Sequence, residues 1–275
     1  MVQVPTVLKK VFETFPVVEY PSLPNSTPII QQSIERNRFY FQRSPPSEKG
    51  AFTLGVFNLF KYQDNYIPTD PLSLAVTLHL CSKHGLKLPN CQGDSGDSGH
   101  SIMKMSYFGS PNSFLPILIE DGTSREIHLA SALISGICKS DDVKETLLSD
   151  LLDVELYDLW LLSVWFEYEK LDLTALFGIE IVSLTKYELF ESILTWRDFK
   201  VRYPILNRSI YDAKLSHVEE LLSLLSEDLN NLSRGHLIKV YAYVIIVENL
   251  MKSTEARKVI PSKLSLNASN YMNGM

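Results

Sequence analysis

A short apolar run followed by a capped helical pattern is the clearest feature of the first half of the chain. The run "FTLGVFNLF", residues 52–60, is nearly all apolar, which is typical of a buried central strand. A helix is predicted next, because Asp70 is a good N-cap, Pro71 suits the first helical position and Gly85 suits the C-terminal cap. A buried strand leading into a capped helix predicts the start of a βαβ unit.

Three further strands and one helix are predicted before residue 140. The last two of these strands are joined by the turn signal Asp121-Gly122, so they should form an antiparallel hairpin. The predicted strands are residues 102–108, 117–120 and 125–129, and the helix is "LASALISGICK". Residues 51–139 are therefore expected to form a compact α/β domain with the order strand, helix, three strands, helix.

From Ser140 onward the hydrophobic positions recur with helical spacing. The stretch "DDVKETLLSDLLDVELYDLWLLSVWF" has acids spread around the helix and apolar residues elsewhere, so a central and largely buried helix is expected. Further helices are predicted near residues 186–196, 216–232 and 236–251, and the polar end "SKLSLNASNYMNGM" is expected to be frayed. Residues 140–275 are thus predicted to be a helical domain with a polar C-terminal tail.

Residues 1–50 form a proline-rich arm in which a long helix or a central strand is not expected. One short amphipathic helix fits between the prolines, with an apolar stripe at Leu8, Val11, Phe12 and Phe15. The stripe must pack against another surface. Its own domain is one candidate and a partner protein is the other.

Composition indicates an ordinary globular protein in a reducing compartment. Of 275 residues, 45% are hydrophobic and 21% charged, and the formal net charge of −6 argues against wrapping nucleic acid. The three cysteines give no even disulfide framework, and the N-terminus lacks the continuous apolar core of a secretory signal. The longest apolar run, residues 240–247, is too short to cross a bilayer, which takes about 20 residues.

Two motifs suggest chemistry, but neither is complete. The stretch "GDSGDSG", residues 93–99, repeats a glycine-rich unit and is interpreted as a flexible surface loop rather than the setting of a serine nucleophile. Cys81 and His84 share a helix face near Cys91, but a fourth zinc ligand is missing. We therefore predict no catalytic residue, no metal site and no cofactor.

The stretch "WRDFKVRYPILNR" interleaves basic residues with aromatic ones. Arg197, Lys200 and Arg202 are candidates for binding anionic lipid headgroups, RNA or an acidic partner. The alternative is a solvated helix end followed by a loop.

The order of elements resembles the glutathione-transferase architecture, an N-terminal thioredoxin-like domain followed by a helical domain. Pro116 leads directly into the strand "ILIE", and the resemblance implies a cis Leu115-Pro116 bond. Within that superfamily the chain resembles the metaxin-type subunits of the mitochondrial sorting and assembly machinery, most of all the smaller fungal subunit that caps the β-barrel insertase. That resemblance rests on "VPTVLKKVFETFPVVEY", "LGVFNLF", "TDPLSLAVTLHLCSKHGLKLP" and "LPILIE".

The residues also predict that thiol chemistry has been lost. A transferase stabilises a glutathione thiolate near the N-terminus of the first helix, where Asp70 would place its own negative charge. The family also needs a Glu-Ser pair, or a close equivalent, at the opening of the helix after the fourth strand. The matching residues here are Ile127 and His128, and neither replaces that carboxylate.

The resemblance implies a non-enzymatic, peripheral subunit at the cytosolic face of the mitochondrial outer membrane. Its implied partners are the β-barrel insertase, a second metaxin-like subunit and the β-signal of β-barrel precursors, and it would be held at the membrane through proteins. Under this hypothesis Pro5–Tyr20 is an arm that anchors a partner subunit. The alternative is a glutathione-binding transferase or another thiol-binding module, which retention on a glutathione resin would reveal.

Overall fold

A computed structural model describes residues 28–43, 51–91, 99–106, 109–112, 114–121, 125–178 and 198–274. The chain divides into two compact units, residues 1–36 and 37–275. Within the first unit the described element is helix α2 (Pro28–Arg36), which starts at a proline. The helices expected at residues 8–15 and 186–196 and most of the 93–99 loop lie outside the described residues.

The second unit contains a five-stranded sheet with the order β1-β7-β3-β8-β9. Its central strand β3 is parallel to β7 and antiparallel to β8, and Leu54 lies opposite both Ile102 and Leu118. All three of these side chains are buried. The strands are β1 (Arg38–Tyr40), β3 (Ala51–Val56), β7 (Ser101–Lys104), β8 (Ile117–Asp121) and β9 (Arg125–His128).

The strands predicted at residues 52–60, 102–108, 117–120 and 125–129 all contribute to this sheet in the predicted order along the chain, but two boundaries are wrong. The apolar run 52–60 is divided between β3 and a separate hairpin of β4 (Leu59–Tyr62) and β5 (Asn65–Pro68). The strand expected over 102–108 ends at Lys104. The stretch treated as a proline-rich arm also supplies β1, which occupies an edge of the sheet, and β2 (Gln42–Arg43), which pairs with β6 (Leu86–Lys87).

Helix α3 (Pro71–His84) connects β3 to the parallel strand β7, as a βαβ unit requires. Its predicted caps are confirmed. Asp70 accepts a hydrogen bond from the Ser73 backbone N–H, and Gly85 adopts the left-handed conformation (φ 62°) with its N–H bonded to the Cys81 carbonyl. The Leu115-Pro116 bond is cis, as expected.

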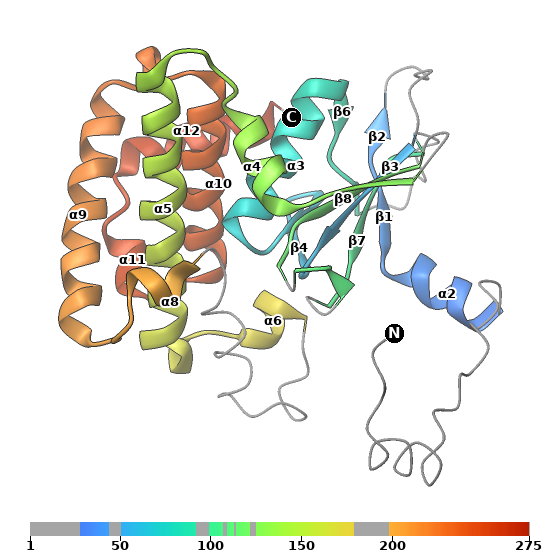
Figure 1. Cartoon of the computed structure of the whole chain (residues 1–275), viewed down its shortest axis with the longest axis horizontal. Helices are drawn as coiled ribbons and strands as arrows, with labels where there is room; N and C mark the ends of the chain where they lie inside the picture. The colour runs from blue at the N-terminus through green and yellow to red at the C-terminus, as the bar shows by residue number, and fades with distance from the viewer. Residues whose placement is uncertain are drawn as a thin grey trace, which may run out of the picture. The chain divides into compact units, whose positions relative to one another are not determined.

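A helical region follows the sheet, and Figure 1 shows it as a bundle beside α3. Its central helix α10 is buried over most of its length because apolar residues occupy nearly every face. The long helix α5 contacts both α10 and α9, and α3 contacts α10. The helices are α4 (Ala130–Ile137), α5 (Val143–Phe166), α6 (Leu173–Phe177), α8 (Phe199–Arg202), α9 (Arg208–Glu227), α10 (Arg234–Leu250), α11 (Glu255–Lys258) and α12 (Ser262–Asn273).

The C-terminus contradicts the expectation of a frayed tail. Residues 262–273 form helix α12, which packs against α10. Leu264, Ala268 and Met272 are buried, so a sparse i, i+4, i+8 apolar row inside a polar sequence is enough to fix the helix. Among the described helices, none combines the length and apolar character needed to cross a bilayer.

Candidate functional site

The N-terminus of α3 is the place where the transferase resemblance would put a thiol, and Asp70 occupies it. Its carboxylate is 2.8 Å from the Ser73 backbone nitrogen, and the side chain is only 1% exposed. Burial raises the pKa of Asp70 from 3.8 to about 6, an effect that hydrogen bonds from Ser73 partly offset. At neutral pH the carboxylate is therefore mostly ionised, and its charge opposes a second anion at this helix end.

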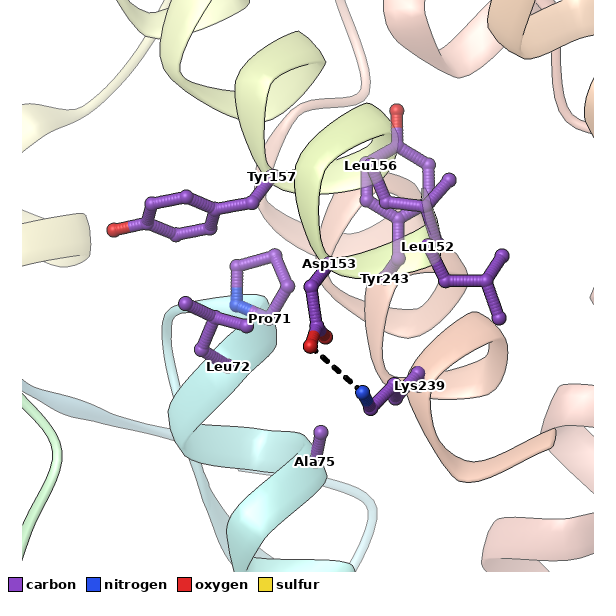
Figure 2. A pocket seen from close by; sticks show the side chains of 9 residues that line it. All are labelled: Pro71, Leu72, Ala75, Leu152, Asp153, Leu156, Tyr157, Lys239 and Tyr243. Carbon is purple, nitrogen blue, oxygen red and sulfur yellow. Dashed lines mark hydrogen bonds and ion pairs between the residues drawn. The ribbon is translucent and has the colours of Figure 1, made fainter. Parts of the chain in front are cut away.

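The space beside this helix end is filled by α5 and α10. A cavity of about 10 Å³ remains between the three helices, which is room for about one water molecule. Small-molecule sites typically measure about 300–1,000 Å³, so a tripeptide does not fit this arrangement. The lining residues drawn in Figure 2 are Pro71, Leu72 and Ala75 of α3, Leu152, Asp153, Leu156 and Tyr157 of α5, and Lys239 and Tyr243 of α10.

A buried ion pair holds the wall of this cavity. The Lys239 ammonium lies 2.8 Å from a carboxylate oxygen of Asp153 and donates to the Ser149 hydroxyl at 2.6 Å. Both charged residues are 5% exposed. Figure 2 draws their ion pair as a dashed line. The pair joins α5 to α10 directly beside α3. The close packing of these three helices therefore depends on the Lys239 and Asp153 charges neutralising each other.

Sequence reasoning missed this ion pair. A partial signal was available, because Lys239 interrupts an otherwise apolar stretch of its helix. A buried charge is stable only when it is paired, so Lys239 requires an acidic partner, and Asp153 is one of several acids in α5. Spacing within one helix, however, does not tell which other helix supplies the partner.

The second part of the expected glutathione site differs in detail from the sequence interpretation. Ile127 and His128 lie in strand β9, not at the opening of a helix. Helix α4 begins at Ala130, and its N-cap is Leu129, which makes no side-chain capping hydrogen bond. Neither the predicted pair nor the actual N-cap offers a hydroxyl or a carboxylate to a peptide backbone at this helix end.

One group of possible metal ligands is found in the described part of the chain, and it was not predicted. The ligand atoms of Glu120, Glu126 and His128 lie within 4.8 Å of one another on the β8–β9 hairpin. Both glutamates are substantially exposed, and His128 Nε2 is 3.3 Å from the Glu120 carboxylate. Cys81, His84 and Cys91, which were considered from the sequence as zinc ligands and set aside, do not form such a group among the described residues, and burial raises the pKa of the Cys81 thiol.

The predicted partner-binding residues have different positions. Leu8, Val11, Phe12, Phe15 and Arg197 lie outside the described residues. Lys200 is half-buried in α8. Arg202 forms a bidentate ion pair with Asp158 of α5, at 2.6 and 2.9 Å, and the Asp158 side chain is fully buried.

The two described aromatic residues of this segment, Phe199 and Tyr203, pack against the rest of the chain. Phe199 is fully buried and its ring lies 4.8 Å from that of Tyr203. Arg208 pairs with Asp212 at 3.0 Å, so two of the basic residues are neutralised within the chain. Sequence alone did not reveal this because the acidic partner of Arg202 is 44 positions away.

Comparison with known proteins supports the resemblance inferred from the sequence. Residues 2–120 match the family described as "SAM35, subunit of SAM complex". Over 176 residues the chain is 32% identical to the "Sorting assembly machinery 35 kDa subunit" of Saccharomyces cerevisiae, an alignment covering 59% of this chain and 53% of that protein. The chain thus spans about half the length of the curated relative it matches. The predicted likeness to a sorting and assembly subunit is confirmed.

Proposed function

With the similarity of residues 2–120 to SAM35 as the premise, we propose that this chain is a non-enzymatic subunit of the sorting and assembly machinery in the mitochondrial outer membrane. That match is the single observation that carries the proposal. It includes β1, β3, α3 and β7, together with most of β8, and so takes in nearly all of the sheet. The proposed role is assembly of β-barrel proteins, not catalysis.

The fold that we propose for the chain is glutathione-transferase-like. Supporting observations are the β3-α3-β7 unit with parallel strands, the cis bond before β8 and the helical region after α4. The α3 terminus favours a scaffold over a thiol enzyme, because the Asp70 carboxylate caps it and the cavity between α3, α5 and α10, of about 10 Å³, is too small for a tripeptide.

The proposed position is peripheral, at the cytosolic face of the outer membrane, held through protein partners. The proposed partners are the β-barrel insertase and a second metaxin-like subunit, with Leu8, Val11, Phe12 and Phe15 as the main anchoring stripe. Arg197, Lys200 and Arg202 are the second proposed contact, although Arg202 is also used in the internal pair with Asp158.

We further propose that the chain helps to recognise the β-signal of β-barrel precursors. Extended peptides are commonly bound by adding a strand to a sheet edge, where backbone groups supply the hydrogen bonds. The outer strands of the five-stranded sheet are β1 and β9, so these edges are the first positions to examine.

Co-purification tests the proposal. A tagged full-length chain is expressed in yeast mitochondria, the outer membranes are solubilised in mild detergent, and bound proteins are identified by mass spectrometry. The insertase is expected to co-purify with the full chain and with a matched control whose 93–99 loop is replaced by a Gly-Ser linker of equal length. If the insertase is absent from both, the proposed function is wrong.

A deletion of Pro5–Tyr20 tests the anchoring arm separately. The deleted chain is expected to lose its partners while its circular dichroism spectrum and thermal unfolding stay close to those of the full chain. Full retention of the partners after deletion would show that the arm does not anchor them.

Site-specific photo-crosslinking tests β-signal recognition. Crosslinkers placed in β1 and β9 are expected to capture a radiolabelled precursor with an intact β-signal and not one whose signal is altered. Equal capture of both precursors would contradict a role in recognising the signal.

A further inference from the structure

Four large aliphatic side chains form an exposed patch on α5 and α9. Val143, Leu147 and Leu151 are 69%, 62% and 40% exposed, and Leu224 is 59% exposed. The three residues of α5 are spaced i, i+4, i+8, so they follow one face of the helix over its first two and a half turns. Scattered single aliphatics on a surface are ordinary, whereas a contiguous row suggests an interaction site.

Leu224 extends this row sideways onto α9, which lies alongside α5 (Figure 1). The helices are antiparallel, since Tyr211 bonds to Ser163 while Lys214 and His217 bond to Glu155. Leu224 lies two turns beyond His217 on the same face, and Leu147 lies about the same distance beyond Glu155. The two leucines are therefore at the same height on the neighbouring helices, and we call these four aliphatic residues the α5–α9 patch.

Farther along α5, the same face packs against helix α8. Asp158, two turns beyond Leu151, is fully buried under Arg202 of α8. The C-terminal half of this face is thus covered by α8, and its N-terminal half carries exposed aliphatic residues. The face is suited to helix packing over its full length, and the described residues cover only part of it.

Acidic residues border the α5–α9 patch. Glu220 and Glu227 lie one turn either side of Leu224, and Asp150 lies one turn from Leu147, and all three are exposed. Among the described residues none of these three makes an ion pair. Lys144 is the basic residue beside the patch, so the border is acidic on balance.

We propose that the α5–α9 patch docks an amphipathic helix of another protein, whose apolar stripe is bordered by lysine or arginine. The aliphatic row supplies an apolar surface for side chains spaced i, i+3, i+4 and i+7 on the partner helix, and the carboxylates favour basic residues along the border of that helix. This inference does not depend on the proposed function, because it concerns the surface of the isolated chain.

Peptide binding to the purified full chain tests the proposal. The probe is a fluorescein-labelled helical peptide of about 18 residues, with a leucine stripe bordered by lysines; a charge-reversed isomer has glutamates instead. By fluorescence anisotropy the lysine peptide is expected to bind at least about tenfold more tightly than the isomer. Added salt is expected to reduce the difference in affinity between the two peptides, because salt screens the exposed charges.

Neutral substitutions locate the binding site. Leu147→Gln and Leu224→Gln are each expected to weaken the lysine peptide at least about tenfold. The matched control is Leu266→Gln on α12, where the leucine is 63% exposed and lies outside the patch. The control variant should bind as the unchanged chain does. All these positions are exposed, and circular dichroism confirms that each variant is folded.

Several results would overturn the proposal. These are no binding of the lysine peptide, equal binding of both peptides, or binding unaffected by Leu147→Gln. Self-association in sedimentation velocity that Leu147→Gln abolishes would assign the patch to a second copy of the chain. Flotation with phosphatidylcholine vesicles that the same variant abolishes would assign it to lipid. Either of these last two results also replaces the proposed occupant.

Discussion

Two buried aspartates, Asp70 at the start of α3 and Asp153 in α5, are stabilised in different ways. Asp153 is paired with the Lys239 ammonium at 2.8 Å. Asp70 has no ion-pair partner among the described residues and depends on the Ser73 backbone N–H at 2.8 Å and on the N-terminal end of α3. One carboxylate is neutralised by a full charge and the other only by partial charges.

The weaker compensation has a consequence for the protonation of Asp70. Partial charges do not fully offset desolvation, so the pKa of Asp70 rises to about 6, and its second carboxylate oxygen is buried without a hydrogen-bond partner. The cap therefore fixes the start of α3 and also strains it electrostatically at neutral pH. Removing one partner of the ion pair is strongly destabilising, because it leaves the other charge buried and unpaired.

Breaking the ion pair is expected to have the largest effect. Lys239→Met leaves the Asp153 carboxylate buried and unpaired, which should lower the free energy of unfolding by about 3–5 kcal/mol. The measurement is urea unfolding followed by tryptophan fluorescence. The double variant Lys239→Met with Asp153→Leu should recover most of the loss. A loss below about 1 kcal/mol in the single variant would contradict the importance of the pair.

Neutralising Asp70 is expected to have the next largest effect, with the opposite sign. Asparagine keeps the cap without the charge, so Asp70→Asn should raise the free energy of unfolding at pH 7 by about 1–3 kcal/mol. The folded pKa of about 6 exceeds the unfolded value of 3.8, so the protonated carboxyl favours folding below pH about 4. That contribution is lost as the pH rises through about 6.

The pH profile is the sharper measurement for this variant. The difference in unfolding free energy between Asp70→Asn and the unchanged chain should shrink as the pH falls from about 7 to 4. Asp70→Ala, which removes the cap as well, is the control for loss of the side-chain acceptor. A difference that stays constant with pH would show that the Asp70 charge is not the cause.

Two buried tyrosines extend the comparison to neutral groups. The Tyr211 hydroxyl donates to Glu167 and lies 3.2 Å from the Ser163 hydroxyl. The buried Tyr243 hydroxyl has no hydrogen-bond partner among the described residues. Tyr211→Phe should lower the free energy of unfolding by about 1–2 kcal/mol, and Tyr243→Phe should change it by less than about 0.5 kcal/mol. Equal losses from the two substitutions would contradict this distinction.

The smallest expected effect concerns glutathione. Neither the unchanged chain nor Asp70→Asn should be retained on a glutathione resin, because the substitution removes the charge but leaves a cavity of only about 10 Å³. Retention of the variant alone would show that charge, not space, excludes the ligand. Competable retention of the unchanged chain would restore the glutathione-binding hypothesis.

The elements that sequence predicted best are those specified by neighbouring residues. Asp70, Pro71 and Gly85 delimited α3 because capping acts within a few residues of the helix end. The break between β3 and β4 was missed because the apolar run continues through it. Helix α12 was missed because three buried positions among polar ones gave too weak a pattern.

Only the part of the candidate site that depends on neighbouring residues could be predicted from the sequence. The Asp70 cap was predicted from neighbouring residues, and the structure confirms that this carboxylate caps α3. The Arg202–Asp158 and Lys239–Asp153 pairs were not predicted, since their members are 44 and 86 residues apart. Arg202 was predicted from the sequence to bind a partner, and the structure shows that it also forms an internal ion pair with Asp158.

The sequence by itself determined the caps of α3, a helix near residues 236–251, the order along the chain of the strands before and after α3, and the likeness to a sorting and assembly subunit. These features depend on local hydrogen bonding and on the periodic spacing of buried residues, both of which are determined by residues close together in the sequence. Only the tertiary structure decided which charges meet, how little space remains beside Asp70 and which aliphatic residues stay exposed. Those properties depend on which helix faces come together, and long-range packing, not neighbouring residues, fixes that choice.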